Sequence, residues 1–256
     1  MAATLQSIRL QFLDSVRGAL WRRDAALLLL AILMFGLWPS ADLWASAQFY
    51  DGSRAFSRDL LWAQLLYRGT SWMAVTVLLL LLAALARPLW QPQSQTRRTQ
   101  RKAAFMLLAL LLGPGLLVNE GFKEHWGRAR PRDVSTFGGH ASFTPAIEPS
   151  RECHSNCSFV SGHAAAGFAL MAFAWVSTRR RLWIVIGISA GAAIGLARIA
   201  AGGHFLSDIV FSGLIVWFSL RGSALLFVRA RAYRRRRERR RLTAPLPVLA
   251  SAEFAG

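Results

Sequence analysis

The stretch LWIVIGISAGAAIGLARIA, residues 182–200, carries one charged residue in an otherwise apolar run. About 20 apolar residues is the length that an α-helix needs to cross the hydrocarbon core of a bilayer. Five more apolar segments occur in the chain, at residues 25–38, 71–86, 103–118, 158–176 and 208–228. The pattern predicts an all-α polytopic membrane protein, a bundle of six transmembrane helices. Since the first three segments are short, their helices are expected to extend into the flanking residues.

The composition separates a membrane protein from other classes of basic protein. The chain of 256 residues is 54% hydrophobic and has a formal net charge of +18. A soluble domain of this size is less apolar, and a nucleic-acid-binding protein would not need apolar segments of membrane-spanning length. We therefore expect the partner of this chain to be the membrane and not a nucleic acid.

The basic residues set the expected orientation of the helices. They form four clusters, which precede the first segment, separate the second from the third and the fourth from the fifth, and follow the sixth. The clusters are Arg9, Arg17, Arg22 and Arg23; Arg87, Arg97, Arg98, Arg101 and Lys102; Arg179, Arg180 and Arg181; and the nine arginines of residues 229–241. With six spans all four clusters lie on one side. Because Lys and Arg near membrane ends stay in the cytoplasm, both termini are expected to be cytoplasmic.

This orientation divides the chain into three parts. Residues 1–23 form a cytoplasmic amphipathic segment, residues 24–228 the six-span membrane domain, and residues 229–256 a basic cytoplasmic tail that we expect to be disordered. No small-residue cleavage site precedes the first span, so that span is expected to act as the insertion signal. The arginines of the tail are interpreted as a topology anchor that contacts anionic headgroups, rather than as a nucleic-acid site.

The outward side carries the first of three polar motifs. Lys123 is followed by six residues and then by Arg130-Pro131. This spacing places two cations about two helical turns apart, and the proline ends the helix. Arginine offers phosphate oxygens a planar fork, and lysine offers them a compact charge. A simple contact with lipid headgroups is the alternative, and the spacing weakens it.

The second motif is Ser161-Gly162-His163, at the start of the fourth apolar segment. A glycine beside a serine at the start of a helix lets backbone N–H groups approach an anion closely. The serine hydroxyl can donate one more hydrogen bond. Taken alone this tripeptide is weak evidence, but its position on the same side as the first motif favours a site for a phosphate group.

The third motif is Arg198, five residues, His204, three residues and Asp208. The i, i+4 spacing of His204 and Asp208 stacks them on one helical face. The carboxylate can accept the proton of one ring nitrogen and leave the other nitrogen free as a nucleophile. An ionisable residue at the edge of a span is costly without a partner, which favours a function over a capping role.

Together, in this order, the three motifs resemble those of the type 2 phosphatidic acid phosphatases: Lys-x6-Arg-Pro, Pro-Ser-Gly-His and Ser-Arg-x5-His-x3-Asp. The resemblance covers residues 25–228. Two positions depart from the family pattern, since Val160 replaces its proline and Ala197 replaces its serine. The second change removes one possible hydrogen-bond donor to phosphate.

The resemblance implies metal-independent hydrolysis of a phosphomonoester without a cofactor. His204 would attack phosphorus and form a phosphohistidine, Asp208 would orient it, and His163 would protonate the leaving alcohol. The implied phosphate-binding residues are Lys123, Arg130, Ser161, Gly162 and Arg198. The remaining histidines, His125, His140 and His154, lack the spacing of zinc ligands and are interpreted as surface residues.

Further short matches resemble the bacterial lipid A phosphatase branch of the family. They are DLW at 42–44, QFYD at 48–51, WGRARP at 126–131, FGG at 137–139 and NCSF at 156–159. The substrate implied is a phosphorylated lipid, lipid A first, at the periplasmic face of a bacterial inner membrane. Phosphatidylglycerol phosphate, phosphatidic acid and undecaprenyl diphosphate remain alternatives, as do a lipid phosphotransferase with the same site and a scaffold without activity.

The only cysteines, Cys153 and Cys157, lie in the long outward segment between the first two motifs. An oxidising periplasm favours a disulfide there over free thiols. The separation of the pair is short, so geometry has to decide. The same segment could cover the site and contact a large anionic headgroup.

Overall fold

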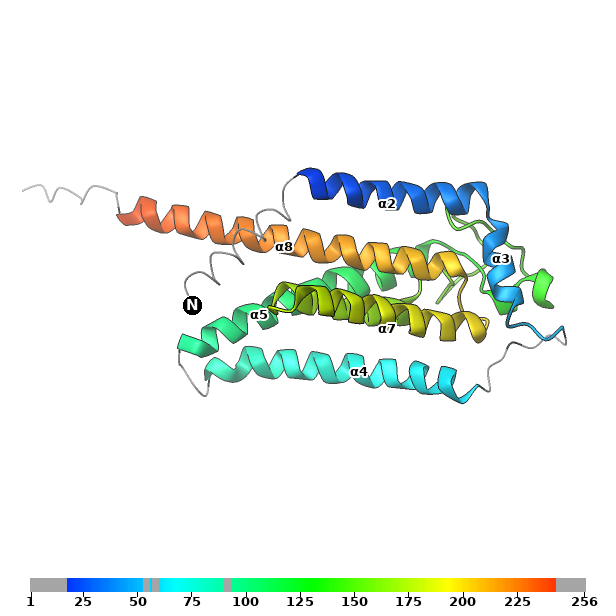
Figure 1. Cartoon of the computed structure of the whole chain (residues 1–256), viewed down its shortest axis with the longest axis horizontal. Helices are drawn as coiled ribbons and strands as arrows, with labels where there is room; N and C mark the ends of the chain where they lie inside the picture. Colours follow the sequence, from blue (N-terminus) through cyan, green and yellow to red (C-terminus); the bar gives the residue numbers. More distant parts are fainter. Residues whose placement is uncertain (1–17, 53–55, 57–59, 90–93, 243–256) are drawn as a thin grey trace, which may run out of the picture.

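The computed structural model describes residues 18–52, 56, 60–89 and 94–242. Over these residues the protein is helical, with two isolated β-bridges and no strand. In chain order the elements are α2 (Gly18–Leu37), α3 (Ser40–Ala47), α4 (Leu61–Ala86), η1 (Arg87–Leu89), α5 (Ser94–Leu110), η2 (Leu111–Lys123), η3 (Pro131–Asp133), η4 (Ser135–Phe137), α6 (Gly162–Phe168), η5 (Ala169–Trp175), α7 (Arg180–Ala200) and α8 (Leu206–Leu242). Figure 1 shows the long helices side by side, with α3 and the loop segments gathered at one end.

Four of the described helices are long and apolar enough to cross a membrane, and α2 with α3 would make a fifth as a pair bent by 81°. The four are Leu61–Ala86, Arg97–Lys123, Arg180–Ala200 and Leu206–Arg234. As expected, the helices of the first three apolar segments extend beyond those segments. The expected bundle of six spans is not confirmed, because residues 158–176 form only the shorter apolar helix Gly162–Trp175.

Burial explains why this short helix need not span the bilayer itself. α6 and η5 bury most of their small and apolar side chains against the surrounding helices. A Cβ atom on Gly167 would lie 2.8 Å from the Cα of Gly191, and a Cβ on Gly187 would lie 2.5 Å from the side chain of Met171. Small residues at these points let α6, η5 and α7 approach closely. The helix is therefore enclosed by protein.

The helix α8 lies at the centre of the bundle, between α2 and α7 in the view of Figure 1. It packs against α2, α5, α6 and α7. α2 is fixed to it by a buried ion pair of Asp24 with Arg221 and by stacking of Trp21 on Phe218. In contrast, α4 exposes many of its leucines, as expected for a helix that faces lipid.

The structure describes part of the expected basic tail. The helix α8 continues to Leu242, so the described part of the basic tail, residues 229–242, is helical rather than disordered. Alanine and arginine, which dominate this part, are strong helix formers. Residues 243–256 and residues 1–17 lie outside the described part of the chain.

Candidate active site

The three motifs meet at the end of the bundle where α3 lies. Lys123 ends η2, Ser161 precedes α6, Arg198 lies in the last turn of α7, and Asp208 in the first turn of α8. His163 lies within electrostatic range of Lys123, Arg130, Arg198 and His204. The structure thus brings together all of the side chains expected at the site, although they come from four separate parts of the chain.

His204 is held in one orientation. Its side chain is 2% exposed, and its Nδ1 lies 2.7 Å from the backbone oxygen of Ser158. Because a carbonyl oxygen only accepts, Nδ1 carries the proton and Nε2 is left with its lone pair. Burial lowers the pKa of His204 to about 4, although Asp208 acts in the opposite direction. The imidazole is therefore neutral near pH 7.

The partner that orients this histidine differs from the expected one. Asp208 Oδ2 lies 3.6 Å from His204 Nδ1, beyond a normal hydrogen bond, whereas the carbonyl of Ser158 lies within one. The same oxygen of Asp208 accepts from Ser158 Oγ at 2.5 Å and from the backbone N–H of Phe205 at 2.8 Å. Asp208 thus acts on the ring by charge, and Ser158 fixes the tautomer.

Arg128 binds the other oxygen of Asp208, and none of the three motifs indicates this role. Its side chain is fully buried, with Nη1 2.7 Å from Asp208 Oδ1 and Nη2 2.8 Å from Asp42 Oδ2. Asp42, on α3, also accepts from the backbone N–H and the hydroxyl of Ser207, at 2.8 and 2.6 Å. We call Asp42, Arg128, Ser207 and Asp208 the carboxylate cluster.

One feature of the sequence could have indicated this cluster. Asp42 lies shortly after the first apolar segment, and Asp208 begins the sixth. Two carboxylates buried at such positions need a cation to offset the loss of hydration. Arg128 is the cation nearest to both. Its guanidinium also lies 4.3 Å from the ring centroid of Phe205. The separation of 86 residues between Asp42 and Arg128 hides the pair from local patterns.

Three cations surround the place where a phosphate group would meet His204. Lys123, Arg130 and Arg198 interact electrostatically with one another. The Nε of Arg198 is buried and lacks a hydrogen-bond partner among the described residues. Gly203 leaves room for this guanidinium, because a Cβ there would lie 2.4 Å from Arg198 Nη2. Arg198 is thus the residue of this group that most clearly retains donor capacity for a ligand.

Ser161 begins α6 as its N-cap, and its Oγ accepts from the N–H of Ala164 at 3.4 Å. The hydroxyl proton is left to donate elsewhere. Gly162 faces the side chain of Asn119, since a Cβ on the glycine would lie 2.9 Å from Asn119 Oδ1. The backbone oxygen of Ser161 accepts from Ser212 on α8 at 2.9 Å, which ties the start of α6 to the helix that carries Asp208.

His163 is half-buried and stacks on Tyr67, with ring centroids 4.5 Å apart and an interplanar angle of 25°. The guanidinium of Arg198 lies 4.8 Å from the centroid of the same tyrosine ring. Tyr67 therefore contacts residues of two motifs from α4, a helix that carries no motif. The sequence offered no pattern that could have pointed to it.

The loop between the first two motifs contacts one of these cations, Arg130. Cys153 and Cys157 are joined by a disulfide, with Sγ atoms 2.17 Å and Cα atoms 5.6 Å apart. Within the loop that they close, the backbone oxygen of Asn156 accepts from Arg130 Nη2 at 2.5 Å and from Nε at 3.2 Å. The disulfide loop is thus in direct contact with one of the residues expected to bind phosphate.

No group of three or more His, Cys, Asp and Glu side chains arranged as metal ligands occurs in the part of the chain that the structure describes. His125, His140 and His154 are exposed at the surface, as expected. His204 and Asp208 are already held by the hydrogen bonds with Ser158 described above. The described site is built from cations, histidines, hydroxyls and the carboxylates of Asp42 and Asp208.

Comparison with known proteins agrees with this arrangement. The family model of the PAP2 superfamily matches residues 102–236. A lipid A 4'-phosphatase of Francisella tularensis subsp. novicida is 35% identical over 201 residues, which cover 74% of this chain and 87% of that protein. Proteins with the same name from Rhizobium etli and Rhizobium leguminosarum are 42% and 39% identical, over 47% and 51% of this chain and 49% and 59% of their own lengths.

No solved structure is detectably similar to the chain. The family match covers all three motifs, and the relative from Francisella extends over most of both proteins. The histidines and cations that these motifs contribute meet at one end of a helical bundle with membrane-spanning helices. The chain therefore belongs to the PAP2 superfamily and is a membrane-embedded lipid phosphatase.

Proposed function

We propose that this protein removes the 4'-phosphate of lipid A, through a phosphohistidine formed on His204. The observation that carries the mechanism is the state of His204: Nδ1 donates to the carbonyl of Ser158 at 2.7 Å, so Nε2 is the nitrogen with a free lone pair. The substrate is proposed from the three relatives, each named as a lipid A 4'-phosphatase.

In the first step, Nε2 of His204 attacks phosphorus as the ester P–O bond breaks. The leaving alkoxide takes a proton from His163, so the lipid departs as an alcohol. The bound phosphate dianion favours the protonated form of His163, because opposite charges at close range stabilise each other. Lys123, Arg130 and Arg198 stabilise the charge on the phosphate oxygens, with Ser161 and the N–H of Gly162 as further donors.

In the second step, water attacks phosphorus and the N–P bond breaks, with His163 now accepting the proton of the water. His204 carries a positive charge while it is phosphorylated. Asp208 lies 3.6 Å from Nδ1 and stabilises this charge without taking the proton. Inorganic phosphate then leaves, and neutral His204 is restored.

The contacts of Tyr67 agree with these roles, because its ring packs against both the proposed general acid, His163, and the phosphate-binding residue Arg198. An aromatic face against an imidazole restricts the rotation of the ring. We propose that Tyr67 is a positioning residue, which aligns the general acid with the phosphate that Arg198 binds. It does not touch the reacting atoms in the mechanism above.

We further propose that the site faces the periplasm and that both termini are cytoplasmic. The arginine-rich end of α8 extends past the bundle at the end opposite to α3 (Figure 1), where positive charge is expected on the cytoplasmic side. The disulfide of Cys153 and Cys157 lies at the other end, and disulfides persist in the oxidising periplasm. The enclosing membrane would be the bacterial inner membrane.

The test is phosphate release by the purified protein in detergent with EDTA present. The lipids compared are lipid A, its 1-phosphate and 4'-phosphate monophosphoryl forms, phosphatidylglycerol phosphate, phosphatidic acid and undecaprenyl diphosphate. We expect lipid A and its 4'-phosphate form to be the best substrates. A preference for another lipid would overturn the assignment of substrate while leaving the mechanism intact.

The mechanism is tested with His204→Ala and with His125→Ala as the matched control, since His125 is exposed and outside the site. The first change should abolish phosphate release, and the second should leave it unchanged. Rapid quenching of the wild type in alkali should trap a phosphoryl group on His204, because a phosphoramidate survives base and is lost in acid. Transfer of phosphate to a lipid acceptor, without release to water, would instead indicate a phosphotransferase.

A further inference from the structure

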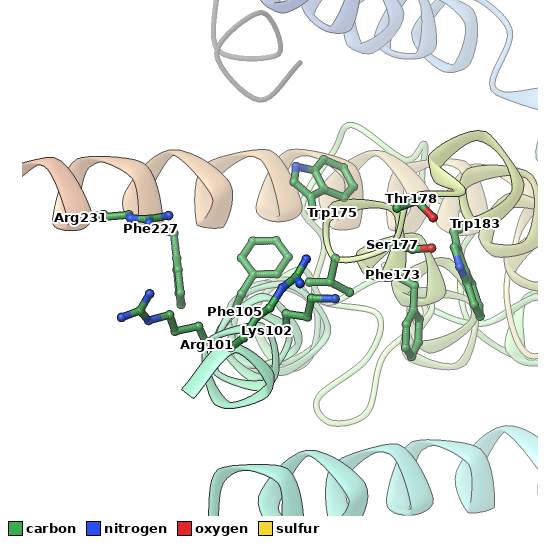
Figure 2. Close-up of a pocket in the computed structure, with 12 residues that line it drawn as sticks. Arg101, Lys102, Phe105, Phe173, Trp175, Ser177, Thr178, Trp183, Phe227 and Arg231 are labelled. Carbon is green, nitrogen blue, oxygen red and sulfur yellow. The ribbon is translucent and has the colours of Figure 1, made fainter. Parts of the chain in front are cut away.

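A cavity with a volume of about 900 Å³ lies at the end of the bundle opposite to the active site. Helix α5, the end of η5 with the turn that follows, the start of α7, and α8 all contribute to its walls (Figure 2). No residue of the three motifs lines it. The cavity is therefore not an extension of the phosphatase site.

The lining combines positive charge with aromatic rings. Arg98, Arg101 and Lys102 come from α5, and Arg231 comes from α8. None of the twelve lining residues is an aspartate or a glutamate. A ligand that meets four cations in a site without a lining carboxylate carries negative charge.

Aromatic side chains form the apolar part of the cavity. Phe105 meets Phe227 edge to face at 5.5 Å between ring centroids, and Phe173 stacks on Trp183 at 4.5 Å. In Figure 2 the first pair lies among Arg101, Lys102 and Arg231, and the second pair lies on the side of Ser177 and Thr178. A small anion such as free phosphate makes no use of such walls. A ligand with an anionic head and a hydrocarbon body uses both parts of the lining.

The position of the cavity along α7 indicates which membrane leaflet the ligand would come from. Trp183 lies in the first turn of α7 and Arg198 in its last turn, and α7 has 21 residues. At 1.5 Å per residue a helix of this length spans about 30 Å, close to the thickness of the hydrocarbon core. The cavity thus lies at the membrane surface opposite to the active site, where Trp and Arg side chains typically meet headgroups.

We propose that this cavity binds an anionic phospholipid of the leaflet opposite to the active site. The headgroup phosphate contacts Arg98, Arg101 and Lys102, and an acyl chain packs against the aromatic pairs. The bound lipid joins α5 to α7 and α8 at the end of the bundle that lacks the carboxylate cluster. This inference depends on the protein spanning a membrane and not on the identity of the phosphatase substrate.

If the basic residues only fixed the orientation of the helices in the membrane, their charges would matter but the cavity would not. The experiment therefore compares charges that line the cavity with charges that do not. The pocket variant is Arg98→Ala/Arg101→Ala/Lys102→Ala. The control variant, Arg22→Ala/Arg23→Ala/Arg181→Ala, removes three exposed charges that line no part of the cavity. Binding of phosphatidylglycerol to the full-length protein in neutral detergent is measured by native mass spectrometry as a function of lipid concentration.

We expect the wild type and the control variant to bind phosphatidylglycerol within about twofold of each other, and the pocket variant to bind it at least tenfold more weakly. Phosphatidylcholine should bind all three proteins equally weakly. Trp183→Ala should also weaken the binding of phosphatidylglycerol, because it removes part of the apolar wall. Unimpaired phosphate release by the variants shows that they are folded.

Three results would overturn the proposal. Equal loss of binding in the control variant would mean that general surface charge attracts the lipid. Retained binding in the pocket variant would place the lipid elsewhere. Displacement of phosphatidylglycerol by inorganic phosphate at comparable concentration, with no effect of Trp183→Ala, would mean that the cavity recognises a free anion.

Discussion

Arg128→Ala tests whether the carboxylate cluster supports both folding and catalysis. The guanidinium is fully buried and holds Asp42 and Asp208 through contacts of 2.8 and 2.7 Å. Removing it leaves two carboxylates buried side by side without their common cation. Loss of one partner from a buried ion pair costs about 3–5 kcal/mol. One carboxylate would then take up a proton, which relieves part of this cost but weakens the negative charge beside His204.

The assay combines thermal unfolding in detergent with phosphate release. We expect Arg128→Ala to destabilise the protein by about 3 kcal/mol or more, and to lower kcat even in the fraction that remains folded. Arg128→Lys restores a charge but not the planar fork that bridges two carboxylates, so it should rescue only part of both losses. The matched control is Arg132→Ala. Its side chain is partly exposed and lies 3.6 Å from the exposed carboxylate of Asp133, and we expect this change to destabilise the protein by less than about 1 kcal/mol.

A double-mutant cycle with Asp42→Ala separates the pair from its surroundings. If Arg128 and Asp42 stabilise each other, the double variant is less destabilised than the sum of the single variants. The reasoning is refuted if Arg128→Ala unfolds within about 1 kcal/mol of the wild type and releases phosphate at the same rate. It is refuted in part if stability falls while kcat is unchanged, because Asp208 would then act without the arginine.

Three further predictions concern the pH profile and the walls of the site. Burial lowers the pKa of His204 to about 4, and protonated Nε2 cannot attack phosphorus. We therefore expect kcat/KM to fall on the acid side only near pH 4. A fall near pH 6.5 that is assigned to His204 would contradict this. Gly203→Ala places a Cβ against Arg198 and should raise KM, whereas Gly222→Ala, with no atom within 4 Å of its Cβ, should not. Tyr67→Ala should lower kcat about tenfold, the size of an aromatic contact, while Tyr67→Phe should keep it; equal losses in both would show that the hydroxyl and not the ring acts.

The sequence predicts the parts of the site that depend on local spacing. Lys123 with Arg130, Ser161 with His163, and His204 with Asp208 are each recognisable within a short window of sequence. The expected helical spacing holds only for Ser161, the N-cap of α6, and His163. Residues 127–130 form no helix, and His204 lies before α8, which begins at Leu206. Hydropathy likewise indicates an all-helical membrane protein. The number of spans is less accessible, since a buried helix such as Gly162–Trp175 is apolar for reasons other than contact with lipid.

The contacts that orient these groups could not be predicted in the same way. Tyr67 reaches His163 across the bundle, and Ser158 reaches His204 through its backbone oxygen, so no residue type marks the interaction. The spacing of His204 and Asp208 suggested a direct hydrogen bond, but the backbone leaves 3.6 Å between them. Sequence patterns report which residues share a face, whereas the partner of a given atom is decided by packing.

Asp42 adds a negative charge to the carboxylate cluster, and this charge gives Asp42 a role distinct from that of Asp208. With both carboxylates ionised, Asp42 and Asp208 with Arg128 carry one net negative charge. This charge lies beside a neutral imidazole before the reaction and beside a cation once His204 is phosphorylated. Asp208 and Arg128 alone would be a neutral pair and would stabilise that cation less. Asp42→Asn keeps the size of the side chain and can still accept from Ser207, but it removes the net charge.

We therefore expect Asp42→Asn to slow the formation of the phosphohistidine while leaving KM for the lipid nearly unchanged. The rate of the phosphoenzyme burst, measured by rapid quench, separates this effect from a defect in substrate binding. Ser207→Ala is the comparison, since it removes a hydrogen bond to Asp42 but keeps the charge. A burst as fast in Asp42→Asn as in the wild type would show that Asp42 only holds Arg128 in place. A slower burst in Asp42→Asn than in Ser207→Ala, at equal stability, would identify the charge of the cluster as what stabilises the phosphorylated histidine.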